Sequence, residues 1–159
     1  MSATPTERLE SVDATASTLN RLIRTSIGGE KGFRAAAGGV SDANLKRLFE
    51  SYSLQRAEFA AELQEELRRY AANAAASGQA GAALDRSLLD DQPSVTGKDD
   101  GTIFSECERG EDATVKTYET ALSSPLPSEL RSIVERQLVR IKEGHDQLRS
   151  LERAHDRHT

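Results

Sequence analysis

Two glutamates, Glu108 and Glu111, stand three residues apart in the acidic segment Phe104–Asp112, where a helix would place both on one face. The same face continues along the chain with the large apolar side chains of Tyr118 and Leu122. Carboxylates that leave water must be paired with a cation, neutralised or bound to a metal. The two glutamates therefore predict a polar site inside an otherwise apolar interior.

Two further polar residues fall on apolar helical faces. Glu30 lies seven residues after Ile23, and His145 lies four residues after Ile141, so each occupies a helical repeat of an apolar position. Three glycines surround Glu30, and each costs a helix up to about 1 kcal/mol relative to alanine. These glycines, at positions 28, 29 and 32, favour close packing or a local backbone adjustment around Glu30.

These candidates offer three carboxylates and one imidazole: Glu30, Glu108, Glu111 and His145. Such groups are ligands for iron, manganese, zinc or copper, so one transition metal ion is a candidate cofactor. The alternative is a structural polar layer in which Arg56 neutralises the carboxylates. The residues expected around either arrangement are Tyr52, Gln55, Arg56, Cys107 and Tyr118.

The composition is that of a mostly helical protein. The chain has 159 residues, 30% of them charged, with four prolines and no tryptophan. This length suits one domain with one core. Periodic apolar residues predict an all-α four-helix bundle over residues 13–155, after a flexible arm at 1–12, with helices at about 14–37, 42–75, 101–123 and 127–154.

Residues 76–100 form a connection that is too long for a simple helix turn. Extended, such a segment reaches about 80 Å, and the helix before it is about 50 Å long, so the chain can cross the whole bundle. This crossover joins two antiparallel hairpins and places the four candidate ligands within about two helical turns of one another. In an up-and-down bundle, Glu111 would instead lie level with Glu62 or Glu66, far from Glu30.

Charge and hydropathy exclude several classes of partner. The formal net charge is −5 and basic residues are interspersed with acidic ones, so no basic stripe is available for nucleic acid. No segment approaches the roughly 18 apolar residues of a membrane span, and residues 1–13 lack the apolar stretch of a secretion signal. A single cysteine excludes an internal disulfide and suits a reducing compartment. We expect a cytoplasmic protein with neither a nucleic-acid nor a membrane partner.

Several stretches carry a resemblance to a known family: residues 19–23 with 29–33, residues 55–63, residues 106–112 with Tyr118, and Gln137 with His145-Asp146. Over these stretches the chain resembles a bacterial family of ferritin-like four-helix-bundle domains of uncharacterised function. The resemblance implies the ferritin-like fold and the crossover topology. It brings no established activity.

The chain departs from the di-iron pattern of ferritin-like carboxylate proteins, which has a Glu-x-x-His motif on two helices. Lys142 stands three residues before His145, and the second helix has Gln55 with no matching histidine. A mononuclear metal site, or a site replaced by salt bridges, fits these residues better than a di-iron centre.

Three functions follow as hypotheses. The first is a cytoplasmic ferritin-like bundle with a structural or stress-associated role, whose interior Glu/His/Arg layer either takes up a transition metal or is closed by Arg56. The second is an oxidoreductase in which the metal activates dioxygen or peroxide. The third is a helical adaptor for another protein. The sequence identifies no catalytic residue and favours a protein that is not an enzyme. The oligomer that we expect, if one forms, is a homodimer.

Overall fold

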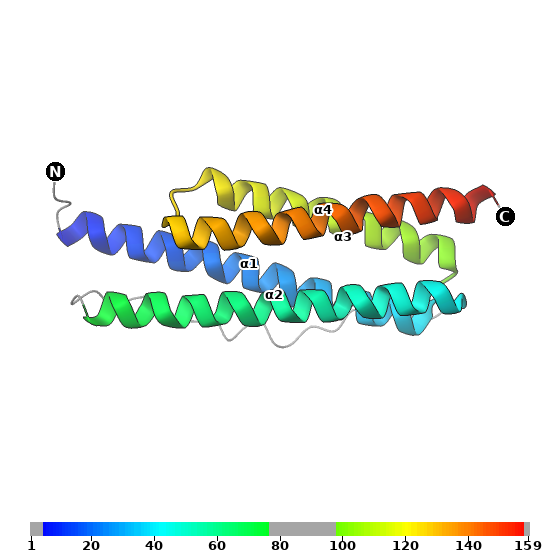
Figure 1. Ribbon diagram of the computed structural model, residues 1–159, viewed down its shortest axis with the longest axis horizontal. Helices are drawn as coiled ribbons and strands as arrows, with labels where there is room; N and C mark the ends of the chain where they lie inside the picture. The colour runs from blue at the N-terminus through cyan, green and yellow to red at the C-terminus, as the bar shows by residue number, and fades with distance from the viewer. Residues whose placement is uncertain (1–4, 77–97, 158–159) are drawn as a thin grey trace.

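The computed structural model describes residues 5–76 and 98–157, and within them the chain forms four α-helices and no strand. The helices are α1 (Pro5–Gly39), α2 (Ala43–Ala76), α3 (Asp100–Ser123) and α4 (Ser128–Arg157) (Figure 1). The prediction of an all-α four-helix protein is confirmed. The predicted crossover at 76–100 falls mainly on residues 77–97, outside the described part of the chain.

Aspartates that bind the backbone just after them set the starts of α2 and α3. The Asp42 carboxylate accepts a hydrogen bond from the backbone N–H of Asn44 at 2.8 Å. The Asp99 carboxylate accepts one from the backbone N–H of Thr102 at 2.7 Å. The first N–H groups of a helix have no partner within the helix, so these carboxylates fix where each helix begins.

The first helix begins at Pro5, well before the start expected near residue 14, so residues 5–12 are helical instead of part of an arm. Proline is well suited to this place because its fixed φ matches the helix and the first turn does not need its missing N–H. The helix start expected near residue 14 was located from the spacing of apolar residues, and that spacing takes no account of a proline at the first helical position.

Each helix lies against two neighbours: α1 packs on α2 and α3, and α4 packs on α2 and α3. The start of α3 lies at the end of the bundle where α1 ends and α2 begins (Figure 1). There the Asp100 carboxylate accepts hydrogen bonds from the backbone N–H and the hydroxyl of Ser41, both at 3.0 Å. As a result, α2 and α3 run in the same direction and lie diagonally across the bundle.

The core of the described residues consists of two hydrophobic clusters with charged groups between them. The cluster near the α1–α2 turn includes Phe33, Phe49, Tyr52, Phe104 and Leu148. The other cluster includes Ile23, Ile27, Phe59, Leu63, Tyr118 and Ile141. On α2 and α3 the residues between the two clusters include Arg56 and Glu111, which are both buried. The middle of the bundle is therefore the place where charge enters the interior.

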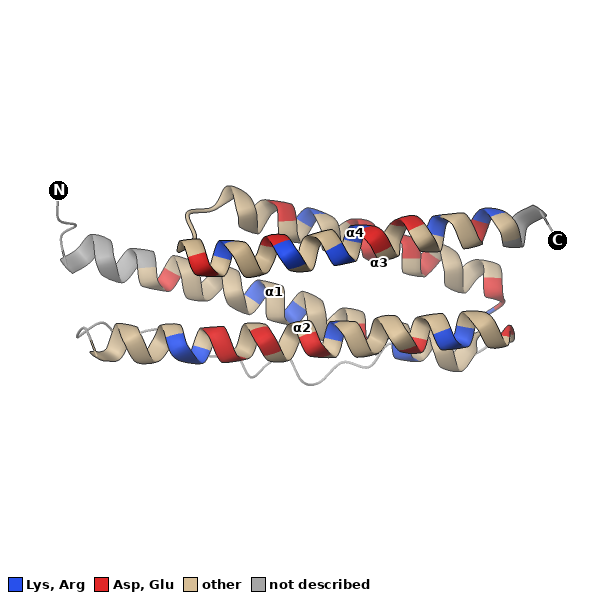
Figure 2. Cartoon of the chain, viewed as in Figure 1, with Lys and Arg blue, Asp and Glu red and all other residues tan. Residues whose placement is uncertain are grey.

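The outer faces of the helices carry charges of both signs. Figure 2 shows Lys and Arg interspersed with Asp and Glu along α2 and α4. Among the described large apolar side chains, only Leu54 and Val139 are exposed. No described helix is long and apolar enough to cross a membrane.

Candidate functional site

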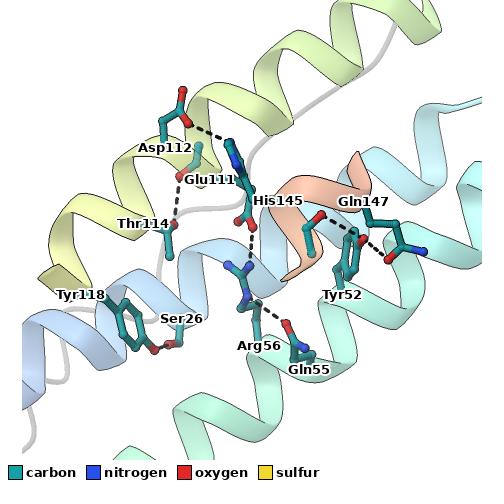
Figure 3. Close-up of polar contacts among 12 residues, drawn as sticks. Ser26, Tyr52, Gln55, Arg56, Glu111, Asp112, Thr114, Tyr118, His145 and Gln147 are labelled. Atoms are coloured by element: carbon teal, nitrogen blue, oxygen red, sulfur yellow. Dashed lines mark hydrogen bonds and ion pairs between the residues drawn. The ribbon is translucent and has the colours of Figure 1, made fainter. Parts of the chain in front are cut away.

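A fully buried ion pair joins α2 and α3 through the middle of the bundle. Nη2 of Arg56 lies 2.5 Å from Oε2 of Glu111 (Figure 3). The two residues are only 1% and 3% exposed. Arg56 is thus the cation that meets one of the two glutamates singled out in the sequence.

The Arg56 guanidinium is held on several sides. Its Cζ atom lies 5.4 Å from the centre of the Phe33 ring, and its Nε is 3.5 Å from the side-chain oxygen of Gln55. Its Nη1 is buried and has no hydrogen-bond partner within the described part of the chain. A Cβ atom added to Gly29 would lie 3.2 Å from Nη1, so the glycine lets α1 approach the guanidinium closely.

A cavity of about 340 Å³ lies between α1 and α3, beside this ion pair. Its walls come from residues 25–36 and 98–114, and they include Glu111. Glycines leave the space: a Cβ atom added to Gly28, Gly32 or Gly110 would meet no atom within 4 Å. At these three positions no side chain projects into the cavity.

A second ion pair lines the same cavity. Nζ of Lys98 donates hydrogen bonds to both carboxylate oxygens of Glu106, at 2.7 and 2.8 Å. These side chains are about one-third exposed, which places the pair toward solvent, whereas the Arg56–Glu111 pair is buried. The charges of these two pairs sum to zero.

The four predicted metal ligands each have a separate protein partner. Glu111 meets Arg56, and Glu30 pairs with Arg34 one turn along α1. Glu108 lies 3.2 Å from Nε of Arg149. Nε2 of His145 lies 2.8 Å from a carboxylate oxygen of Asp112, at the distance of an ion pair without the alignment of a hydrogen bond (Figure 3).

Of the four, Glu108 and His145 are brought within electrostatic reach of each other. Hydrogen bonds with Glu152 and Arg149 hold the pKa of Glu108 below its usual range, and the charge of His145 adds to the effect. Across residues 5–76 and 98–157, no group of three or more His, Cys, Asp or Glu side chains is arranged to hold a metal ion. The carboxylate of Glu111 already has a cation, since Arg56 occupies that position.

A second polar layer lies within the hydrophobic cluster that includes Phe59 and Tyr118, and each of the four helices contributes one residue to it. The Tyr118 hydroxyl donates to the side-chain oxygen of Gln137 at 2.7 Å and lies 3.1 Å from the Ser26 hydroxyl. The Gln137 amide donates in turn to Glu62 at 2.8 Å. Because every group has a specific partner, this layer ties α1, α2, α3 and α4 together in one alignment.

Three weakly acidic groups near the ion pair are held in their neutral forms. Burial, with the charge of Glu111, raises the pKa of Tyr52 to about 12. Burial, with the charges of Glu111 and Glu106, raises the pKa of Cys107 to about 12. Burial also raises the pKa of Tyr118 to about 12. The Cys107 thiol is therefore a poor nucleophile, and the site is better suited to binding than to covalent chemistry.

Sequence reasoning assigned no place in the polar interior or the cavity to four residues that lie there: Ser26, Glu62, Lys98 and Gln137. Glu62 stands in a charge-rich part of α2 that reads as a solvated face, yet it accepts a hydrogen bond from the buried Gln137. The available signal was Gln137 itself, an amide in the apolar repeat of α4 between Val134 and Ile141. Lys98 lies outside every helix and had no periodic signal.

Comparison with known proteins places the chain among helical proteins of unestablished function. Residues 14–124, which span most of α1 through α3, match a family described as a domain of unknown function, DUF2383. The match covers well over half of the chain, so the protein belongs to this family. No curated protein matches the sequence.

A solved structure with a similar fold is that of hypothetical protein Pfu-1136390-001 from Pyrococcus furiosus. The two chains are 10% identical, with a TM-score of 0.66, and the similarity covers 87% of this chain and 88% of the other. At this level of identity the likeness shows the fold alone.

Proposed function

We propose that this protein is a ferritin-like four-helix bundle that binds a small molecule in the cavity between α1 and α3. The observation that carries the proposal is the cavity of about 340 Å³ beside a buried ion pair. Protein interiors are otherwise close-packed, and small-molecule sites begin at about 300 Å³. Both walls of the cavity lie within the part of the chain that matches the family.

The ferritin-like part of the proposal is supported by the directions of the helices. α3 begins beside the α1–α2 turn, where Asp100 binds Ser41, and it runs parallel to α2. Ferritin-like bundles have one long crossover connection, which gives their second and third helices a common direction.

The test fills the cavity from a position that has room for a side chain. Gly32→Phe places a ring in the cavity, whereas Gly38→Phe adds the same bulk to α1 at a glycine that has equal room but does not line the cavity. Naphthalene is titrated into the isotope-labelled protein and both variants, and amide signals are followed by NMR. We expect residues 25–36 and 98–114 to respond in the native protein and in Gly38→Phe, and the response to be lost in Gly32→Phe.

Naphthalene binding that survives Gly32→Phe, or that perturbs other regions only, would overturn the proposal. Native mass spectrometry of protein isolated from its expression host gives a second readout. A bound small molecule that accompanies the native chain and Gly38→Phe should be absent from Gly32→Phe.

A transition metal held by Glu30, Glu108, Glu111 and His145 stays a second candidate. The observation in its favour is that the His145 imidazole lies beside Asp112 and acts on Glu108, so an imidazole and carboxylates share the α3–α4 side of the bundle. Iron, manganese, zinc and copper are measured in protein purified without an affinity tag, then again after reconstitution. Stoichiometric metal that is lost in both Glu111→Ala and His145→Ala would support this candidate, and its absence after reconstitution would remove it.

A further inference from the structure

The carboxylate of Glu111 has one oxygen to spare beside the cavity. Oε2 accepts the hydrogen bond of Arg56. Oε1 has no hydrogen bond within residues 5–76 and 98–157, and it is not among their fully enclosed side-chain atoms that lack a partner. Oε1 therefore keeps some accessible surface, and the space that Glu111 adjoins is the cavity. Arg56 is not part of the wall, so the ion pair presents its acidic member to the cavity.

The other polar groups near Glu111 also accept hydrogen bonds. Thr114 lies one turn further along α3, and its hydroxyl donates its hydrogen to the carbonyl oxygen of Gly110 at 2.9 Å. That oxygen is left with accepting capacity only. Thr25, on the α1 wall, adds a hydroxyl that can accept or donate. Hydrogen bonds to an ionised group are the stronger kind, so Oε1 of Glu111 is the main acceptor of this part of the wall.

The rest of the lining is largely apolar. Phe33, Ala36 and Ile103 line the cavity and belong to the hydrophobic cluster near the α1–α2 turn. The Cys107 thiol of the same wall is neutral, because burial, with the charge of Glu111, raises its pKa to about 12. These surfaces favour an apolar body, which displaces water from them.

The charges at the cavity are already balanced. Arg56 neutralises Glu111, and Glu106 neutralises Lys98. A cationic ligand would lose its hydration and leave a net positive charge in the interior. An anionic ligand would meet the carboxylate of Glu111 at close range, and the two charges would repel each other. Both arguments favour a ligand without charge.

From these observations we infer that the ligand is a small, uncharged, mainly apolar molecule bearing a hydroxyl or N–H group, and that this group donates a hydrogen bond to Oε1 of Glu111. The inference rests on the proposed function, since it assigns the chemistry of the ligand to the same cavity. It makes Glu111 a specificity-determining residue, and Arg56 the residue that holds its carboxylate in place.

Four probes with the same ring system test the assignment. 2-Naphthol has an O–H donor, 2-methoxynaphthalene has a methyl group in place of that hydrogen, naphthalene has neither, and 2-naphthylmethylammonium adds a positive charge. Each is titrated into the isotope-labelled full chain at neutral pH. We expect 2-naphthol to bind about tenfold more tightly than naphthalene or the ether, the gain from one hydrogen bond to a charged acceptor. The ammonium compound should bind more weakly than 2-naphthol.

A second readout identifies the acceptor directly. The NMR signal of the Glu111 side-chain carboxyl carbon should shift with 2-naphthol and not with 2-methoxynaphthalene. The variant Arg56→Met with Glu111→Leu removes both charges and keeps the interior filled, so it should bind naphthalene and lose the tenfold preference for 2-naphthol. The matched control, Glu108→Leu with Arg149→Met, removes an ion pair of α3 that does not line the cavity and should keep the preference.

The outcomes separate this inference from the proposed function. Binding of 2-naphthol no tighter than that of naphthalene or the ether, or tightest binding of the ammonium compound, overturns the inference and leaves the cavity as a binding site. A preference that survives Arg56→Met with Glu111→Leu, or a Glu111 carboxyl signal that does not respond, shows that Glu111 is not the acceptor. This signal is measured in the native chain, so it decides even if the variants fail to fold. If no probe perturbs the cavity residues, both the inference and the proposed function fail.

Discussion

Arg56 and Glu111 carry opposite charges in the buried interior of the bundle, and each stabilises the other there. Taking two charges into a protein interior costs several kcal/mol per ion, and a close pair recovers much of that cost. Removing one partner leaves an uncompensated buried charge, whereas removing both leaves an apolar interior. The two kinds of substitution should therefore behave very differently.

We expect Glu111→Ala to lower the free energy of unfolding by about 3–5 kcal/mol, because Arg56 is left buried without a counter-charge. The double variant Arg56→Met with Glu111→Leu should have a free energy of unfolding within about 1 kcal/mol of that of the native protein, or higher. Urea unfolding followed by circular dichroism measures both.

The matched control is Glu108→Ala, one turn away on α3. Its carboxylate pairs with Arg149 near solvent, so the loss should be within about 1 kcal/mol. A cost for Glu111→Ala no larger than that of Glu108→Ala would contradict the role assigned to the buried pair.

At the scale of the element, α1 is the helix whose sequence works against its own stability. Three glycines lie within residues 28–32, in the interior of a 35-residue helix. Glycine weakens a helix because its backbone is free in the unfolded chain. Their placement follows from what faces them: Gly29 adjoins Arg56, and Gly32 adjoins the cavity.

Alanine substitutions should separate these two roles. We expect Gly32→Ala to raise the free energy of unfolding by about 0.5–1 kcal/mol, since its Cβ meets no atom within 4 Å. Gly29→Ala should gain less or lose stability, because its Cβ would lie 3.2 Å from Nη1 of Arg56. Thermal unfolding of the two variants compares them directly, and an equal gain would show that Gly29 is not needed for close approach.

The helix ends show what a sequence does and does not specify. The caps at Asp42 and Asp99 were predictable because each carboxylate binds N–H groups two or three residues away. The position of Glu30 on its helix was also predictable, but the direction of its side chain was not. Periodicity places the Cα atom, and a flexible glutamate can still turn its carboxylate to Arg34 on the same helix.

At the scale of the whole molecule, the neutral forms of two buried tyrosines and the partly buried Cys107 set a limit on alkaline stability. Cys107, Tyr52 and Tyr118 have pKa values of about 12 in the folded protein, raised from ordinary values of 9.0 and 10.0. Between these values the folded chain keeps protons that the unfolded chain releases. The stability that these groups contribute is thus complete below about pH 9 and declines as pH rises toward 12.

We expect the urea midpoint to be similar at about pH 8 and about pH 9 and to fall steadily from about pH 9 upward. Of these three groups, Cys107 loses its proton first in the unfolded chain, and Cys107→Ala removes it. In this variant the fall should begin nearer pH 10, where the tyrosines of the unfolded chain lose their protons. A midpoint that stays constant to about pH 11 would contradict the raised pKa values.

The whole arrangement also explains why the sequence led further for the fold than for the site. Helix number, order and cores follow from apolar spacing along the chain, which is local information. The sequence offered Arg56 as a cation for the carboxylates but left open a metal in its place and did not say which carboxylate it meets. The contacts of Arg56 with Glu111 and of Gln137 with Glu62 each join residues far apart in the sequence on different helices. Such pairs depend on the rotation of each helix about its axis, and a shift of a few tens of degrees would exchange one partner for another.

The hydrogen bonds between Ser41 and Asp100 join the hairpin of α1 and α2 to the hairpin of α3 and α4, so they form only when the two hairpins meet. Short turns let α1 with α2, and α3 with α4, form early as separate hairpins, whereas contact between α1 and α3 joins residues that are much further apart in the sequence. The two walls of the cavity belong to different hairpins, so the cavity does not exist until the halves dock. A ligand held there would bind only the docked state and would draw the folding equilibrium toward it.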